Sequence, residues 1–541
     1  MHFFYYLLIS LSTLGYGFFL NNTLKLDSKN LGIIGFFGIF FLILLSYVSS
    51  FFIAHGYLFN SLILIIGLIF LSFFLKKNLV KKKDIIIFSI IFLVLFIFIL
   101  SGKNHDDFPY YHFPYTYLLT QDSHPFGLGQ MNNGFRNPSS LFYLNSLFYL
   151  PGINIYLLHI GSVFFLGFAN LFFIKNIFDY DKFKKIKFYS LLNLFFLIFI
   201  NIFFYRLAEY GTDRLGSILI IICFVILSML INLDPKDFEN DQKELMGFLF
   251  IVGSLAISMK PFYLIYFSLL FFFIYYKNLH DPFLKFIKSK LSILIFLFVT
   301  LIFLINFTNS GCLLFPAKFT CFEYFDWSVS KKEVEDVRVW YELWAKAGAT
   351  PNFVVDERTD YIADFNWLPN WFEVYFFNKV TDYFLGISIL SIIIYLTFKA
   401  KKKIHISKRN YLLLILFLFF YLIEWFLFHP SLRYGGYHIF ILIVFIFLAI
   451  SLERHEIRWN SFKKKSVILV LLTLLIFFGR NLTRLDKEYK LYNYNIFESM
   501  NYKFIGGDKD FYFRYNDIID KKEFNYKYIY IFGKKILIIK N

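Results

Sequence analysis

The sequence is poor in charged residues, cysteine and proline. Only 17% of its 541 residues are charged, whereas 58% are hydrophobic. A soluble protein with this balance would have too little polar surface to cover itself. Three cysteines and 12 prolines also exclude a disulfide scaffold and a collagen-like or proline-rich low-complexity chain. The low content of charged residues, cysteine and proline therefore excludes the ordinary classes of soluble protein.

Long apolar runs recur from one end of the chain to the other. A helix needs about 20 apolar residues to cross the roughly 30 Å hydrocarbon core. We therefore predict an all-α polytopic membrane protein with about 13–14 transmembrane helices. The first run lacks a basic flank, so we expect a mature helix rather than a cleavable signal peptide. The expected spans are 3–20, 31–54, 58–75, 84–101, 153–174, 188–204, 215–232, 246–258, 261–276, 291–306, 383–398, 411–428, 434–451 and 466–479.

Basic residues give the chain a formal net charge of +17 and concentrate in short connections between spans. Counting alternate connections places all the strongly basic ones on one side, and the positive-inside rule makes that side cytoplasmic. No basic domain stands apart from the spans, so we expect no nucleic-acid partner. The basic connections are 76–83, 175–187, 277–290, 399–409 and 453–465.

The opposite side receives the two largest connections, 102–152 and 307–382. The chemically versatile side chains concentrate there, so a candidate site would face away from the cytoplasm. The expected organisation is N-terminal helices at 1–83, a transmembrane module at 84–310 with the acidic outer loop 102–152, a cap loop at 307–382, C-terminal helices at 383–479, and a small outer α/β or β segment at 480–541.

The first outer loop contains the stretch "NHDDFPYYHFPY". Asp106 and Asp107 are neighbours, so their side chains point apart in a regular backbone and only one would enter a given pocket. Tyr111 and His112 follow directly, and Arg136 comes later among glycines and asparagines. "SLFYLNSLFYL" near the end of the loop has the pattern of a helix lying along the interface. Hydrated loop and active site are both compatible with this composition, and the density of polar groups favours a site.

Further polar residues stand at other outer helix ends. "EYGTDR" carries Asp213 and Arg214, for which internal pairing is the simplest interpretation. Lys260 precedes a proline, and "SLRYGG" carries Arg433 and Tyr434. Cations at helix ends can extend to the interface, as long basic side chains often do. They are also the groups that bind a lipid phosphate, arginine as a fork and lysine as a point charge.

The order of these features resembles the GT-C superfamily of integral-membrane glycosyltransferases. Its members carry acidic residues in a first large outer loop, and a bacterial branch shows Asp-x-x-x-Tyr-His-x-Pro, which Asp107, Tyr111, His112 and Pro114 match. A group of bacterial GT-C-like membrane proteins is more similar, through "DDFPYYHFPY", "EYGTDR", "KPFYLIY" and "SGCLLFPAKFTCF". The resemblance covers about residues 100 to 380. More helices precede the acidic loop here than in the commonest GT-C plan, so helix numbers do not transfer.

The resemblance implies an inverting transfer from a polyprenyl-phosphate-linked sugar to a glycan, lipid or protein acceptor, among membrane lipids at the outer face of the bacterial cytoplasmic membrane. It implies that a carboxylate, Asp107 or alternatively Asp106, accepts the proton of the acceptor hydroxyl. The same pair could instead hold Mg²⁺ or Mn²⁺. The expected substrate-binding residues are His112, Tyr111, Arg136, Asp213, Arg214, Lys260, Arg433 and Tyr434.

Two other functions fit the same residues. A glycan polymerase of the O-antigen type also combines many helices with large outer loops, and it would need an essential arginine and no essential aspartate. A transporter or flippase for a lipid-linked solute would need ionisable residues deep within spans. Glu424 in "YLIEWFLF" is the clearest such residue, and it stands near the outer end of its helix.

The second outer loop carries a cysteine pair and many tryptophans. Cys312 and Cys321 share one loop on an oxidising face, so we expect a disulfide that braces the loop locally, with free thiols as the alternative. Trp327, Trp340 and Trp344 are typical of an ordered cap at the membrane interface. They could also form a platform on which a sugar stacks.

Overall fold

The computed structural model describes most of the chain. The described residues are 1–76, 80–98, 100, 107–207, 211–232, 239–349, 358–405, 411–492, 526–531 and 534–539. Asp106, one of the two aspartates predicted to be catalytic or to bind a metal, lies outside them. Asp107 lies inside.

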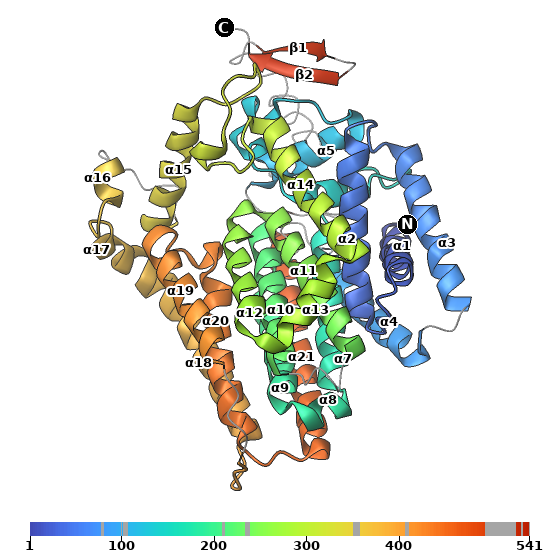
Figure 1. Cartoon of the computed structure of the whole chain (residues 1–541), viewed down its shortest axis with the longest axis vertical. Helices are drawn as coiled ribbons and strands as arrows, with labels where there is room; N and C mark the ends of the chain where they lie inside the picture. Colours follow the sequence, from blue (N-terminus) through green and yellow to red (C-terminus); the bar gives the residue numbers. More distant parts are fainter. Residues whose placement is uncertain are drawn as a thin grey trace.

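Helices dominate the described part of the chain (Figure 1). Eight are long and apolar enough to cross a membrane, which fits an all-α polytopic membrane protein. They are His2–Thr23, Leu31–Ser50, Tyr57–Lys76, Thr212–Asn232, Lys290–Ser310, Leu368–Phe398, Gly436–Glu453 and Trp459–Leu491. Shorter apolar helices are Gly161–Ile177, Lys187–Phe203, Pro261–Tyr275 and Leu412–Phe428.

The N-terminal helices pack closely because glycines line their contacts. These helices are α1 (His2–Thr23), α2 (Leu31–Ser50) and α3 (Tyr57–Lys76). A Cβ atom on Gly15 would lie 1.8 Å from the Gly67 carbonyl oxygen, and one on Gly38 would lie 1.9 Å from that of Thr13. Small residues allow helix backbones to approach in this way within a membrane.

The centre of the molecule is a bundle whose buried side chains are mainly Phe, Leu and Ile. Its members include α7 (Gly161–Ile177), α9 (Lys187–Phe203), α10 (Thr212–Asn232), α11 (Glu239–Met259), α20 (Gly436–Glu453) and α21 (Trp459–Tyr492). The start of α7 lies at Gly161 rather than at the predicted residue 153, because turns with positive φ at Gly152 and Asn154 precede it.

The chain changes helix type at Lys260, between the expected spans 246–258 and 261–276. α11 ends at Met259, Lys260 is extended (φ −153°, ψ 131°), and Pro261–Leu270 forms a 3₁₀ helix, η6, before α12 (Phe271–Tyr275). Pro261 has no N–H, and its ring keeps the preceding residue out of the α region. The break therefore fixes where the Lys260 side chain leaves the backbone.

The structure differs from two expectations, for the surroundings of one helix and for the length of another. α6 (Ser140–Ser146) has only buried residues, so "SLFYLNSLFYL" does not form an interfacial helix. α21 continues to Tyr492, beyond the predicted end at 479. Its last turns are polar and gain from i,i+4 pairs such as Arg484–Glu488 and Lys490–Asp486, both at 2.7 Å. The antiparallel strands β1 (Tyr526–Ile531) and β2 (Lys534–Ile539) follow.

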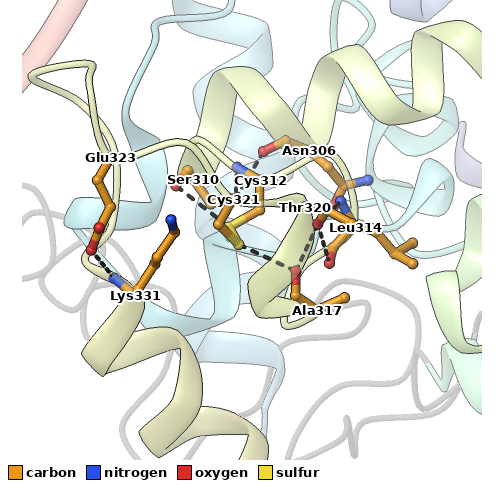
Figure 2. Close-up of a disulfide and its surroundings, with 9 residues drawn as sticks. All are labelled: Asn306, Ser310, Cys312, Leu314, Ala317, Thr320, Cys321, Glu323 and Lys331. Atoms are coloured by element: carbon orange, nitrogen blue, oxygen red, sulfur yellow. Dashed lines mark hydrogen bonds between the residues drawn. A yellow bond between two sulfur atoms is a disulfide. The ribbon is translucent and has the colours of Figure 1, made fainter.

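The cap loop is ordered by a disulfide between Cys312 and Cys321, the pair that the sequence suggested (Figure 2). Thr320 Oγ1 donates to the carbonyl of Ala317 at 2.8 Å, and Cys312 and Cys321 are buried with Phe315. Beyond the disulfide the cap forms α15 (Lys331–Lys346), α16 (Arg358–Ile362) and α17 (Leu368–Trp371), which leads through the π-helix η8 (Phe372–Val380) into α18 (Thr381–Phe398). In Figure 1 these cap helices lie towards the end of the bundle opposite α8 (Tyr180–Lys185).

Candidate active site

Charged residues from four distant parts of the chain meet at one end of the bundle. Asp107 precedes the π-helix η2 (Phe108–His112), and Asp213 lies in the first turn of α10. Lys260 lies at the break between α11 and η6. Arg433 belongs to the short 3₁₀ helix η9 (Leu432–Tyr434), between α19 (Leu412–Phe428) and α20. We call these residues the charged cluster.

Arg433 connects the two carboxylates of the charged cluster. Its Nε pairs with Asp213 Oδ2, and its Nη2 lies 3.4 Å from Asp107 Oδ2. Lys260 Nζ pairs with the other oxygen of Asp213. Two cations therefore balance two carboxylates, and Asp213 is held by both cations.

The four side chains differ in access to solvent. Asp213 is 10% exposed, whereas Asp107 is 36% exposed. Lys260 and Arg433 are intermediate, at 25% and 32%. Asp213 is therefore the buried residue to which both cations bind. Asp107 and the two cations are the parts of the cluster that a substrate can reach.

The surroundings shift the pKa values of the two cations in opposite directions. Burial by itself lowers the pKa of Arg433, but the surrounding groups, above all the Asp213 carboxylate, together outweigh burial, and the pKa lies above its usual value. Burial lowers the pKa of Lys260, and Asp213 opposes this only in part. Arg433 is therefore a permanent cation, the kind of group that can stabilise a phosphate at any working pH.

Hydrogen bonds to the backbone hold Asp213 in place. The hydroxyls of Tyr263 and Ser217 each donate to the Asp213 carbonyl at 3.0 Å. Tyr263 comes from η6, so it ties the first turn of α10 to the segment that begins beside Lys260. Gly216 permits this contact, because a Cβ there would lie 2.2 Å from the Tyr263 ring.

Aromatic side chains border the charged cluster. The Tyr111 hydroxyl donates to Asp107 Oδ2 at 3.3 Å. Lys260 Nζ lies 5.4 Å from the ring centroid of Tyr434, and Arg433 Cζ lies 5.8 Å from the ring of Trp344. The rings of Trp344 and Tyr434 are themselves 5.4 Å apart. Rings that stand next to cations in this way can also bind the face of a sugar.

Among the contacts described, three of the predicted substrate-binding residues, His112, Arg214 and Arg136, form no ion pair with the charged cluster. His112 is buried, with its ring 5.2 Å from that of Phe142. Arg214 follows Asp213 on α10 and interacts electrostatically with Tyr437. Successive side chains on a helix point about 100° apart, so Asp213 and Arg214 face different surroundings.

Arg136 joins the acidic loop to the cap. Its Nε donates to the Gly129 carbonyl at 2.9 Å, and its Nη2 lies 3.4 Å from Glu333 on α15. Burial lowers the pKa of Arg136, and Glu333 opposes the shift. The side chain is thus engaged in positioning the cap over the acidic loop.

Tyr341, which the sequence did not single out, also lies beside the cluster. Burial raises its pKa, and the hydroxyl interacts electrostatically with Arg136, Asp107 and Arg433. Tyr341 and Trp344 are three residues apart on α15, so they share one face of this helix. That spacing was visible in the sequence, but the direction of this face was not.

The pair predicted to hold a divalent metal ion, Asp106 and Asp107, is only half described, because Asp106 lies outside the described residues. Among them, no group of three or more His, Cys, Asp or Glu residues is placed to hold one. Both oxygens of Asp213 already face cations, and a metal beside Lys260 and Arg433 would meet electrostatic repulsion. We therefore derive no chemical step through Mg²⁺ or Mn²⁺.

Replacing Gly216 with alanine is expected to disturb the charged cluster indirectly, because Gly216 contacts Tyr263 and is not itself part of the cluster. The added methyl group would displace Tyr263, at a cost of about 1–3 kcal/mol for overpacking. The displaced hydroxyl would no longer hold the Asp213 carbonyl. We expect a lower melting temperature and weaker activity, measured by thermal denaturation and by the glycan assay described below. Gly253→Ala is the control, because no atom lies within 4 Å of a Cβ at Gly253; equal behaviour of the two variants would contradict this role.

Comparison with known proteins assigns the chain to a family but does not assign an activity. No curated protein and no solved structure matches the chain. One family model, described as "Domain of unknown function (DUF8201)", matches residues 1–440, which include all four residues of the charged cluster. The chain therefore belongs to the DUF8201 family.

Proposed function

We propose that the protein is a membrane glycosyltransferase. It transfers a sugar from a polyprenyl-phosphate-linked donor to a cell-envelope acceptor, on the extracytoplasmic side of the bacterial cytoplasmic membrane. The proposal includes a GT-C-like arrangement with about 13–14 spans. The observation that supports it best is the meeting of Asp107, Asp213, Lys260 and Arg433 at one end of the bundle.

The position of the charged cluster suits a lipid-linked donor. The headgroup of a membrane lipid lies at the ends of transmembrane helices, next to the hydrocarbon core. Asp213 stands in the first turn of α10, and Arg433 lies just before α20. A phosphate anchored by a lipid tail would thus meet Lys260 and Arg433. The attached sugar would extend towards the aromatic side chains of the cap.

The chemistry is a single displacement at the anomeric carbon. The acceptor hydroxyl gives its proton to Asp107, and its oxygen forms the new bond to the anomeric carbon. The bond between this carbon and the phosphate oxygen breaks, and the electron pair leaves with the phosphate. Lys260 and Arg433 stabilise the negative charge that develops there. Attack opposite the leaving group inverts the anomeric configuration.

Charge balance explains why an arginine lies between two aspartates. When Asp107 takes up a proton it loses its charge, while the leaving phosphate gains one. Arg433 can then turn from Asp107, which it contacts at only 3.4 Å, to the phosphate. Asp213 remains paired throughout and keeps both cations in position. The net charge of the site thus stays constant during the reaction.

A glycan polymerase of the O-antigen type is the second candidate. The central place of Arg433, which contacts both aspartates, favours it. In a polymerase the arginine would bind the diphosphate, and Asp107 would only orient the arginine. Transport has less support: Glu424 stands near the end of α19, with its Oε1 3.4 Å from His429 Nδ1, so this carboxylate does not lie deep in a span.

Loss of the gene is expected to remove a sugar, or a polymer of sugars, from the cell envelope. The measurement is mass spectrometry of envelope glycans and of extracted lipid-linked sugars. The deletion strain is compared with the same strain complemented with the wild-type gene. A transferase predicts accumulation of its lipid-linked donor together with an unmodified acceptor. Unchanged glycans and lipid-linked sugars in the deletion strain would contradict both candidates.

A further inference from the structure

A pocket rich in basic side chains lies at the end of α18 and α21 that is remote from the charged cluster. Its volume is about 250 Å³. The pocket is lined by Phe398, Lys399, Ala400, Lys402, Glu456, Ile457, Arg458, Ser461 and Lys465. Arg433 stands before the first residue of α20, whereas Glu456 comes after its last. Because α20 has 18 residues, about 27 Å of helix separates the two places.

Backbone pairing between two connections builds this pocket. The Glu456 N–H donates to the Lys402 carbonyl at 2.9 Å, and the Ile404 N–H donates to the Arg454 carbonyl at 2.8 Å. His455 Nδ1 lies 2.7 Å from the Ala400 carbonyl oxygen. The structure therefore brings two of the most basic connections of the sequence into direct contact, although like charges repel.

Internal partners satisfy only part of the positive charge in the pocket. Lys402 pairs with Glu456 at 3.0 Å, and Glu456 is the single acidic residue of the lining. Lys465 Nζ donates to the Thr397 carbonyl at the end of α18, where a cation suits the helix dipole. Lys399 and Arg458 have exposed side chains, and Lys399 Nζ lies 5.6 Å from the ring of Tyr395. Cations thus exceed carboxylates by three, which an anionic ligand would offset.

The surroundings of the pocket favour a lipid as the source of that anion. Exposed apolar side chains continue from the pocket along both helices, Ile393 and Leu396 on α18 and Ile468 and Leu471 on α21. They are the side chains that acyl chains would cover. A basic pocket at the ends of transmembrane helices is a known arrangement for binding anionic lipid headgroups.

We propose that the pocket formed by Lys399, Lys402, Arg458 and Lys465 binds the phosphate of an anionic phospholipid headgroup, with the acyl chains along α18 and α21. This site is separate from the charged cluster and does not depend on the proposed transferase function. Arginine and lysine supply the charge, and the Ser461 hydroxyl is available as a hydrogen-bond donor to a phosphate oxygen.

Lipid binding to the purified full-length protein tests the proposal. Dioleoyl-phosphatidylglycerol is added in detergent, and bound lipid is counted by native mass spectrometry while the melting temperature is recorded. Dioleoyl-phosphatidylcholine and inorganic phosphate are the comparison ligands. We expect phosphatidylglycerol to bind and to raise the melting temperature. Its affinity should fall about fivefold for each cation removed in Lys399→Gln and Arg458→Gln.

Lys463→Gln and Lys464→Gln are the matched controls, since these exposed lysines lie on the same helix but do not line the pocket. Equal loss of binding in control and pocket variants would overturn the site. So would full binding in the pocket variants, or binding of phosphatidylcholine with the same affinity. Inorganic phosphate that displaces phosphatidylglycerol and stabilises equally would overturn the lipid assignment. Lys399 and Arg458 are exposed, so both single variants should fold; Arg458→Lys, which keeps the charge, should retain most of the binding.

Discussion

Asp107→Asn is expected to abolish sugar transfer while leaving the protein folded. Asparagine has nearly the same shape and can still accept hydrogen bonds from Tyr111 and Arg433, but it cannot take up the proton of the acceptor. Loss of a general base lowers a rate by about 100- to 10,000-fold. The Asp213 pairs with Lys260 and Arg433 stay intact in this variant, so the melting temperature should change little.

The measurement is envelope glycan content in the deletion strain that carries the variant, together with the amount of folded protein after detergent extraction. Asp326→Asn is the matched control, because Asp326 is an exposed aspartate of the cap. It should support wild-type glycan levels. Wild-type transfer by well-folded Asp107→Asn would remove Asp107 as the base and shift the interpretation to the polymerase.

Arg433→Lys is expected to cause the second large loss of activity, although the positive charge is kept. Arg433 contacts Asp213 through Nε and Asp107 through Nη2 at the same time, and the single ammonium of lysine cannot reproduce this fork. It would also lose the contact with the ring of Trp344. Removing one preorganised donor of this kind costs about 100- to 1,000-fold in rate.

Turnover and donor binding are to be measured separately for this variant, with a synthetic polyprenyl-phosphate sugar as donor. Loss mainly in turnover would fit a role on the leaving phosphate. Arg338→Lys is the control, because Arg338 is an exposed residue of α15 that pairs only locally, with Glu335 and Glu342, among the contacts described. Near-normal turnover by Arg433→Lys would contradict the assigned role.

The two variants together separate the proposed functions. A transferase of the proposed type needs both Asp107 and Arg433. A polymerase needs Arg433 and tolerates Asp107→Asn. If neither substitution affects glycans that the deletion does remove, the charged cluster is a structural ion-pair network and the chemistry lies elsewhere in the protein.

The composition and the order of apolar runs were sufficient to predict the membrane class and most helices. This works because the backbone in a bilayer must satisfy its own hydrogen bonds, so that long apolar runs form helices. Pro261 stands at the change from α11 to η6, which falls between the predicted spans 246–258 and 261–276, since proline has the same local effect in any surroundings. The shared place of Cys312 and Cys321 in one loop, predicted to lie on an oxidising face, also suggested their disulfide.

Other features depended on contacts that no local pattern records. "SLFYLNSLFYL" has an amphipathic pattern, but α6 is buried between other elements instead of lying at a surface. The polar sequence after residue 479 suggested the end of a span, yet α21 continues because pairs such as Arg484–Glu488 support it. Periodicity and polarity show which structures a segment can adopt. Contacts with neighbouring elements determine which of them it adopts.

The same division holds for the candidate site. The sequence by itself determined which helix ends carry ionisable groups, and counting the spans predicts that these ends face outward. Only the tertiary structure decided that Asp107, Asp213, Lys260 and Arg433 meet, whereas His112 faces Phe142 and Arg136 faces Glu333. The reason is physical: the direction of a side chain at a helix end depends on the rotation and tilt of the helix, which packing against distant segments sets.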